Sequence, residues 1–149
     1  MNVFKTSTTL LTAGVLSLGM VAIAAPQVRA EYETFELAPD FYPDPAVGTG
    51  ISGGERTTEA CGFIDTADAP DHTLYLNEEF DYLRVYVESA GDVTLYMEWV
   101  ETGEVICVDD SNGTLLPEFE GTWPAGTYNI WIGDFDQAGY PYQLYITEL

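Results

Sequence analysis

The chain has 149 residues, and its 25 acidic residues against four basic ones give a formal net charge of −21 at pH 7. A chain of this length predicts one domain. So strong a negative charge excludes nucleic acid as a partner, because the phosphates would repel the protein.

Residues 1–30 have the pattern of a secretory signal peptide. Lys5 supplies the charged start, residues 10–25 are apolar and rich in small side chains, and residues 28–30 fit the rule for cleavage after Ala30. The apolar run is short and interrupted for a membrane-spanning helix of about 20 residues; an uncleaved anchor is the alternative. We therefore expect an exported protein, periplasmic or extracellular, with no membrane insertion after cleavage.

After residue 30 the chain keeps all 25 acidic residues and only two basic ones, Arg56 and Arg84, so the formal charge of the mature chain is −23. One interpretation is solubility in a salty exterior, where screening relieves the self-repulsion. The other is that some of the carboxylates collect divalent cations.

We expect residues 31–60 to form an irregular lead-in that is rich in proline and glycine, with at most a short edge strand at residues 35–37. Residues 48–53 match the letters of the G-x-G-x-x-G dinucleotide motif. No apolar strand precedes them and no amphipathic helix follows, so we reject a nucleotide site.

From residue 61 to residue 149, hydrophobic side chains recur at every second position, which is the period of a strand with one buried face. Turn residues separate these runs at intervals of roughly 8–12 residues. The connections are too short for crossover helices, so we expect antiparallel strands in a single all-β domain, a sandwich with a jelly-roll-like arrangement. The expected strands are residues 72–76, 82–88, 93–99, 104–108, 118–123, 127–133 and 142–147.

The two cysteines of the chain, Cys61 and Cys107, both follow the predicted signal peptide. An even number of cysteines in an exported chain predicts a disulfide. A bond between residues this far apart would stabilise the fold by about 4 kcal/mol. A metal or redox pair is the alternative, although the sequence has no C-x-x-C motif.

A tight acidic turn at residues 109–113 is the strongest candidate for an ion site, and two further aspartates follow the next long strand. Carboxylate and amide oxygens are the ligands that Ca²⁺ prefers, although the spacing does not match an EF-hand. The alternative is a plain hairpin turn, because Asn-Gly is the favoured pair of a type I′ turn. The candidate calcium ligands are Asp109, Asp110, Asn112, Asp134 and Asp136.

Aromatic residues are numerous, with ten tyrosines, seven phenylalanines and three tryptophans. Trp131 lies between Ile130 and Ile132, so alternation turns it away from the face that the isoleucines share. Outward aromatic rings can stack on sugars or contact a protein partner. The alternative is that the rings pack across strands or under a covering segment. The candidate ligand-binding residues are Trp123, Trp131 and Tyr140.

Signals for catalysis are nearly absent. His72 is the only histidine, and no serine has the G-x-S-x-G setting of a nucleophile. A carboxylate pair such as Glu78 and Glu79 could hydrolyse glycosides, but among 25 acidic residues such pairs arise by chance. We expect no enzyme, a structural or surface His72, and an ion pair between Arg84 and a carboxylate on a neighbouring strand, for example near Glu98.

Four segments together resemble the bacterial pre-peptidase C-terminal domain: F-D-Y-L-R-V-Y-V-E-S-A-G-D-V-T-L (80–95), C-V-D-D-S-N-G (107–113), P-E-F-E-G-T-W-P-A-G-T-Y-N-I-W-I-G (117–133) and Y-Q-L-Y-I-T-E (142–148). That domain is a β-sandwich found beside secreted proteases and as stand-alone exported proteins. The resemblance implies a jelly-roll-like, non-catalytic domain. Some relatives bind calcium, which would place ligands at Asp109, Asp110 and Asn112, and collagen-binding members of the wider group bind protein fibres. No protease precedes the domain here, so an accessory role within one chain is not expected.

We therefore predict an exported, disulfide-bonded and non-catalytic β-sandwich that binds a polysaccharide or a protein at the cell surface. A calcium-stabilised structural protein of the envelope, without a specific ligand, is the alternative. A small hydrolase is a third hypothesis.

Overall fold

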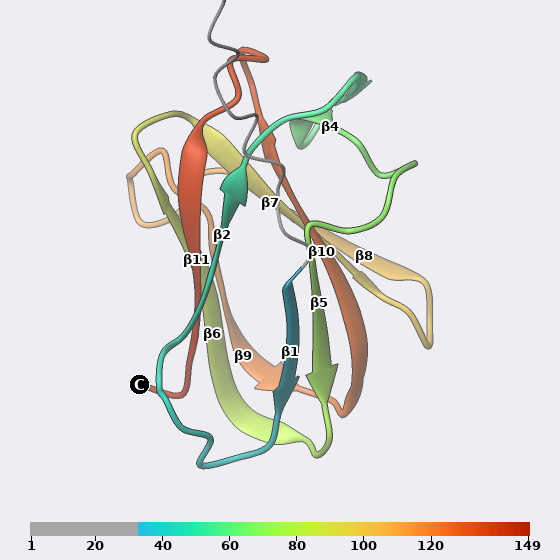
Figure 1. Ribbon diagram of the computed structural model, residues 1–149, viewed down its shortest axis with the longest axis vertical. Helices are drawn as coiled ribbons and strands as arrows, with labels where there is room; N and C mark the ends of the chain where they lie inside the picture. The colour runs from blue at the N-terminus through green and yellow to red at the C-terminus, as the bar shows by residue number, and fades with distance from the viewer. Residues whose placement is uncertain (1–32) are drawn as a thin grey trace, which may run out of the picture.

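The computed structural model describes residues 33–149, which form two packed β-sheets (Figure 1). The predicted signal peptide and its cleavage site after Ala30 lie outside these residues. No segment within residues 33–149 is a helix long and apolar enough to cross a membrane.

Eleven β-strands make up the regular structure of the described residues. In chain order they are β1 (Glu33–Leu37), β2 (Ala46–Ile51), β3 (Arg56–Thr58), β4 (Gly62–Ile64), β5 (His72–Leu76), β6 (Phe80–Ser89), β7 (Val93–Trp99), β8 (Glu104–Val108), β9 (Glu118–Trp123), β10 (Gly126–Asp134) and β11 (Pro141–Thr147).

The strands divide between two sheets. In the first sheet β1 pairs with β5, β5 with β10, β10 with β7 and β7 with β8, while β4 pairs with the end of β10 and β3 with β4. The second sheet has the order β2-β11-β6-β9. The inner faces of both sheets contribute to one hydrophobic core. The predicted all-β sandwich is therefore confirmed.

The inward faces of the strands are those that alternation predicts. On β6, Leu83, Val85 and Val87 are at most 1% exposed, and on β10 Ile130 and Ile132 are fully buried. Burial of one such side chain stabilises the fold by about 1.5–3 kcal/mol. This alternation therefore sets which face of each strand turns toward the other sheet.

One pair of strands departs from the expected antiparallel arrangement. β1 runs parallel to β5, with Phe35 opposite Leu74 in the register. After β1 the chain crosses to the second sheet, where β2 pairs with β11. Because β1 is not joined to its neighbour by a hairpin, nothing in its connection requires the antiparallel direction.

The structure also differs from the expectation of an irregular lead-in over residues 31–60. This segment supplies β1, β2 and β3, and β2 forms an edge of the second sheet. The glycines of β2 allow close packing against buried side chains. A Cβ at Gly48 would lie 2.6 Å from a carboxylate oxygen of Glu33 and 2.8 Å from a ring carbon of His72, and one at Gly50 would overlap the Tyr142 hydroxyl. The glycines that suggested a loop are therefore needed for the close packing of β2 in the sandwich.

The predicted disulfide between Cys61 and Cys107 is confirmed, with the two Cα atoms 6.0 Å apart. Cys61 precedes β4 and is buried, whereas Cys107 lies on β8. The bond therefore ties the segment of β3 and β4 to the edge strand of the first sheet.

Candidate functional site

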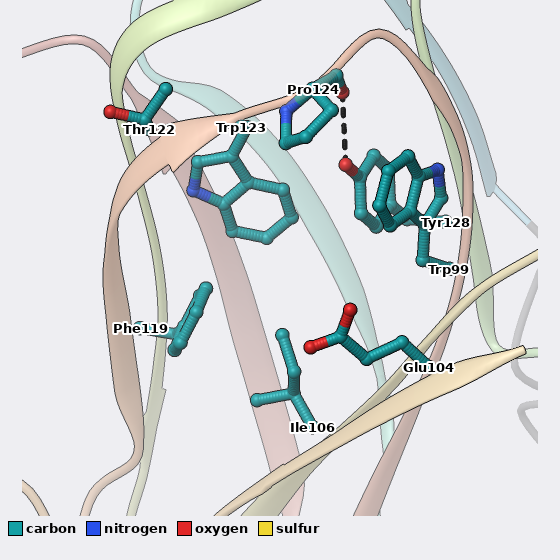
Figure 2. Close-up of a pocket in the computed structure, with 8 residues that line it drawn as sticks. All are labelled: Trp99, Glu104, Ile106, Phe119, Thr122, Trp123, Pro124 and Tyr128. Carbon is teal, nitrogen blue, oxygen red and sulfur yellow. Dashed lines mark hydrogen bonds between the residues drawn. The ribbon is translucent and has the colours of Figure 1, made fainter. Parts of the chain in front are cut away.

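A groove opens between the two sheets beside their edge strands β8 and β9 (Figure 2). Its wall includes Trp99 at the end of β7, Ile106 on β8, Phe119 and Trp123 on β9, and Tyr128 on β10. The groove has a volume of about 170 Å³, which is below the roughly 300–1,000 Å³ of small-molecule sites. It therefore has room for one ring or one side chain of a larger ligand.

Four aromatic rings in contact form one wall of the groove. Trp99 stacks on Tyr128 with ring centroids 6.0 Å apart and an interplanar angle of 12°. Tyr128 meets Trp123 at a steep angle with centroids 4.9 Å apart, and Trp123 meets Phe119 edge to face at 5.4 Å. Each such pair contributes about 0.5–1.5 kcal/mol beyond its buried area. The rings therefore hold one another in place, and the wall is formed before any ligand arrives.

Two polar groups of this wall already have partners within the protein. The indole Nε1 of Trp123 donates to the carbonyl of Leu83 at 2.9 Å. The Tyr128 hydroxyl donates to the carbonyl of Pro124, also at 2.9 Å (Figure 2). The surface that these rings present consists of C–H groups and π faces, so the part of a ligand that contacts it is apolar.

The rim of the groove is anionic. The exposed Glu104 directs its carboxylate into the groove beside Ile106 (Figure 2). Nearby, the Glu101 carboxylate accepts a hydrogen bond from the backbone N–H of Thr127 at 3.0 Å. Burial raises the pKa of Tyr128 to about 12, and the charges of Glu101 and Glu104 add to this rise. The groove therefore combines an apolar wall with a negative rim.

The three aromatic residues predicted to bind a ligand lie in different places. Trp123 is 2% exposed and contributes to the groove wall. Trp131 faces away from the core, as alternation predicts, but Tyr96 on the neighbouring strand packs edge to face against it and it is only 6% exposed. Tyr140 donates its hydroxyl proton to Asp136 at 2.5 Å. These three rings do not form one site.

Carboxylates gather where β7 begins and β8 ends. Oxygen atoms of Asp92, Asp109 and Asp110 lie within 4.8 Å of one another. One carboxylate oxygen of Asp92 and one of Asp109 are buried without a hydrogen-bond partner. Burial raises the pKa of both groups, and the charge of Asp110 raises it further. Three close oxygens with few donors form a set that a divalent cation can bind.

The other predicted calcium ligands are arranged differently. The charge of Asp136 also raises the pKa of Asp92, although burial and the charge of Asp110 have larger effects. Asp134 is fully buried and accepts hydrogen bonds from the Ser52 hydroxyl at 2.9 Å and the Gly139 N–H at 3.1 Å. Asn112 donates to Glu118 at 3.3 Å. The structure therefore joins Asp109 and Asp110 with Asp92, which the sequence argument missed, and directs Asp134 and Asn112 to other partners.

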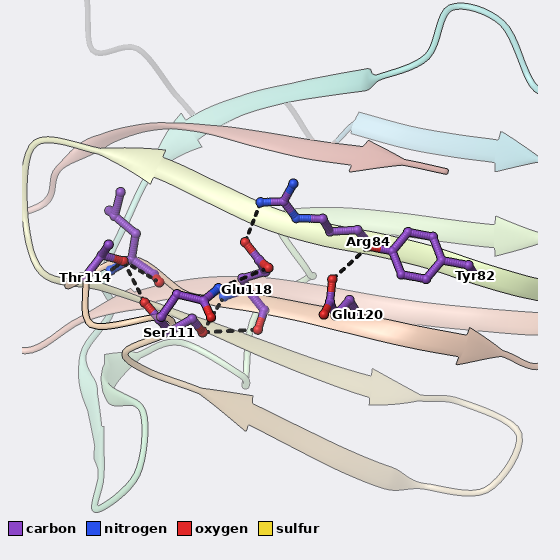
Figure 3. Close-up of polar contacts among 8 residues, drawn as sticks. Tyr82, Arg84, Ser111, Thr114, Glu118 and Glu120 are labelled. Carbon is purple, nitrogen blue, oxygen red and sulfur yellow. Dashed lines mark hydrogen bonds and ion pairs between the residues drawn. The ribbon is translucent and has the colours of Figure 1, made fainter. Parts of the chain in front are cut away.

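Arg84 lies on the outer face of the second sheet and forms an ion pair with Glu118 at 2.5 Å (Figure 3). Its guanidinium also lies 4.4 Å from the ring centre of Tyr86. The expected ion pair with a carboxylate on a neighbouring strand is therefore confirmed, but its suggested position near Glu98 is wrong, because β6 pairs with β9 in the second sheet while Glu98 lies on β7 in the first. A partly exposed pair of this kind contributes about 0–1 kcal/mol.

The single histidine is fully buried. Its Nε2 lies 2.8 Å from the Tyr142 hydroxyl, and its Nδ1 lies 3.7 Å from the Glu33 carboxylate. Burial lowers the pKa of His72 to about 4, so the ring is neutral at pH 7. These contacts place His72 inside the sandwich, which is one of the two positions expected for it.

Comparisons with known proteins support the fold. No protein-family model matches the chain. Over 99 residues the chain is 38% identical to Uncharacterized protein Synpcc7942_2126 of Synechococcus elongatus, a match that covers 64% of this chain and 70% of that protein. The crystal structure of the pre-peptidase C-terminal domain of collagenase from Bacillus anthracis superposes with a TM-score of 0.50 and 10% identity, covering 78% of this chain and 97% of that domain. This second likeness shows a pre-peptidase C-terminal-like fold, and the fold alone.

Proposed function

Because the chain belongs to the family of the Synechococcus elongatus protein and has a pre-peptidase C-terminal-like fold, we propose that it is an exported, non-catalytic accessory module. In this proposal it is a member of the pre-peptidase C-terminal group that binds a polysaccharide or a protein at the cell surface. The structural likeness is to the pre-peptidase C-terminal domain of a collagenase, and the histidine of this chain is buried in the core.

The observation that carries this proposal is the groove between β8 and β9. Trp99, Ile106 and Phe119 stay partly open to solvent there, although β7 buries Leu95 and Met97 and β9 buries Trp123 on their inward faces. Large apolar side chains left open between two sheets lose part of the stabilisation that burial gives. Such an arrangement is typical of a surface that a ligand covers.

Arrays of glycans and of immobilised extracellular proteins test the proposal. Ile106→Ser removes apolar surface from the groove, and Val105→Ser on the opposite face of the same strand is the matched control. We expect the first variant to lose binding and the second to keep it. Absence of binding on both kinds of array, or equal binding by the two variants, would contradict the proposal.

Export is supported by the signal-like pattern of residues 1–30 and by the disulfide. Mass spectrometry of the protein recovered from periplasm and medium measures its N-terminus. We expect a chain that begins at Glu31. An intact chain that remains in the cytoplasm would contradict this part of the proposal.

A second function, calcium-dependent stabilisation, is favoured by the cluster of Asp92, Asp109 and Asp110. Its two buried oxygens without donors would gain a cation as their partner. A ligand that binds only the folded state raises stability by about 2.7 kcal/mol at a hundred times its Kd. We therefore propose that Ca²⁺ stabilises this end of the first sheet.

Thermal unfolding in calcium chloride, in magnesium chloride and in sodium chloride of equal ionic strength tests this second function. The sodium arm is needed because any salt relieves the repulsion in so acidic a chain. We expect a rise in Tm that is specific to calcium, disappears in Asp109→Asn and persists in Glu79→Gln, which changes the charge equally at an exposed turn. Equal shifts in all three salts would remove the calcium site.

A further inference from the structure

We propose that the groove and the free edge of β8 bind an extended basic segment of a partner protein, which adds a strand to β8 and inserts one apolar side chain between Ile106 and Phe119. This inference rests on the proposed binding function and names the ligand class of the same groove.

The first argument is the unpaired edge of β8. This strand pairs with β7 on one side, and no strand of residues 33–149 pairs with its other side. Edge strands usually carry lysine, proline or a bulge that blocks pairing with another chain. Four of the five residues of β8 are Val105, Ile106, Cys107 and Val108, and none of these devices is present. The edge is therefore open to strand addition, a recurring mode of peptide recognition.

The facing edge strand, β9, is protected. It carries Glu118 and Glu120, and its Gly121 has a φ of 148° within an irregular stretch of the pairing with β6. Two charges together with irregular pairing oppose strand addition more strongly than the single charge of β8, Glu104 at its first position. β8 is therefore the edge of this groove that can accept a partner strand.

The register of β8 determines which partner side chains reach the groove. Ile106 pairs with Met97 of the core, whereas Val105 pairs with Glu98 on the outer face. Side chains of an added strand would alternate in the same way. The side chain opposite Ile106 would enter the groove, and side chains two residues away would lie on the same face, one of them beside Glu104.

The size of the groove agrees with this arrangement. Its volume of about 170 Å³ is too small for a separate ligand of ordinary size but suits one aliphatic or aromatic side chain. Main-chain hydrogen bonds to β8 would supply the rest of the affinity, as they do in other complexes formed by strand addition.

Charge identifies the partner as basic. The carboxylate of Glu104 at the rim accepts no hydrogen bond from any residue among 33–149, and the charged Glu101 lies nearby. A lysine or arginine two residues from the apolar side chain would pair with Glu104. A second copy of this chain is disfavoured, because each mature copy carries a formal charge of −23.

The test uses a blocked, fluorescein-labelled peptide of seven residues, with a central leucine, lysines two residues to either side and threonines elsewhere. A matched peptide replaces both lysines with glutamates. We expect the lysine peptide to bind at least about tenfold more tightly by fluorescence anisotropy, with the difference shrinking as salt is added. Failure of the lysine peptide to bind would overturn the inference.

Two protein variants separate the site from general attraction to an acidic protein. Glu104→Lys and Glu98→Lys change the net charge equally, but Glu98 lies on the outer face of the first sheet. We expect Glu104→Lys to weaken the lysine peptide at least about tenfold and Glu98→Lys to leave it near the wild-type affinity. Equal weakening by both variants would overturn the inference.

N-methylation of the peptide tests strand addition itself. Backbone N–H groups of a strand alternate between its two edges, so methylation of one alternate set removes the bonds to β8 and methylation of the other set does not. We expect only one set to abolish binding, and we expect amide exchange at residues 104–108 to slow when the unmodified peptide binds. Equal binding of both methylated peptides would overturn the inference.

The same exchange and fluorescence measurements with cello- and chito-oligosaccharides distinguish this inference from the proposed function. If the sugars alone occupy the groove, the binding function stands and the peptide inference fails. If neither sugars nor peptides occupy it, both fail.

Discussion

At one side of the sandwich the edge strands are β1 and β2, and at the other they are β8 and β9. On the β1–β2 side, the glycines of β2 bring its backbone against His72 and Tyr142, and these two side chains bond to each other. On the β8–β9 side, Trp123 of the second sheet meets Tyr128 of the first, while Trp99 and Phe119 pack on these rings and line a groove.

The difference shows how side-chain size decides whether two alternating sheets close at an edge. Glycine at an inward position lets the sheets approach until backbone meets side chain. Bulky rings at inward positions support one another and hold the edges apart. The packed side therefore contributes mainly to stability, while the groove side is free to contribute to binding.

The largest expected effect is loss of the disulfide, which fastens β8 on the groove side. Replacing both cysteines, Cys61→Ala with Cys107→Ala, opens a loop with a sequence separation of 46 residues. We expect the free energy of unfolding in urea to fall by about 4 kcal/mol, with amide exchange accelerating more in β8 than in β2. A fall of less than about 1 kcal/mol in the free energy of unfolding, or equal acceleration of amide exchange in both strands, would mean that the disulfide does not stabilise the groove side more than the packed side.

The pH dependence of stability tests the packed side, where the half-buried Asp71 and the fully buried His72 act in opposite directions. Burial raises the pKa of Asp71 from 3.8 to about 6, although the hydrogen bond from the Ile132 N–H opposes this rise. Burial lowers the pKa of His72 from 6.5 to about 4. The Asp71 contribution is therefore complete below pH 3.8 and is lost as pH rises through 6. The His72 contribution is complete above pH 6.5 and is lost as pH falls through 4.

Each of these pKa shifts changes the free energy of unfolding by about 3 kcal/mol. Because the two changes have opposite signs, they nearly cancel in the wild-type protein between pH 4 and pH 6. We expect Asp71→Asn to lose stability as pH falls across this range and His72→Gln to lose stability as pH rises. Urea unfolding at several pH values measures both slopes. Parallel slopes in the two variants would contradict the assignment.

A smaller effect is expected from a methyl group on the inner face of β2. Gly48→Ala places a Cβ against Glu33 and His72, so we expect the free energy of unfolding to fall by about 1–3 kcal/mol. Thr49→Ala, at the exposed position next to it, is the control and should change stability by no more than about 0.5 kcal/mol. Equal effects of the two changes would show that the approach of β2 to the core is not tight.

The smallest effect on stability is expected on the groove side. Ile106 is only partly buried, so Ile106→Ala should cost about 1 kcal/mol or less in urea unfolding, less than the loss of 2–5 kcal/mol that is usual for a core isoleucine. Ile130→Ala on β10 is the comparison, because its side chain is fully buried. A similar loss in both variants would show that the groove is core rather than binding surface.

Alternation of hydrophobic residues is sufficient to predict the strands β5 to β11, their inward faces and the sandwich, because burial of one face is a local property of the sequence. The cysteine pair could be predicted from its number and the expected compartment. β2 could not be predicted in this way, since Gly48 and Gly50 suggest a loop until the side chains of His72 and Tyr142 are known to lie against them.

The candidate sites depend more strongly on the tertiary structure. Asp92 lies near Asp109 because β7 and β8 form a hairpin. The turn between Trp99 and Glu104 sets the register of the two strands, and counting back along them from this pair would have predicted the contact. The same pairing places Trp99 and Ile106 on one face of the hairpin, but no comparable signal brings Phe119 to them. The three residues come from β7, β8 and β9, and they meet because the edges of two different sheets face each other.

The sequence by itself determined the strands, their buried faces and the acidic surface, since each follows from residue type and local spacing, and it determined the covalent bond through the number of cysteines and the expected compartment. Only the tertiary structure decided that one side of the sandwich packs tightly and the other keeps a groove. That outcome depends on which strands become neighbours across the core, and distant contacts of this kind leave no period in the sequence.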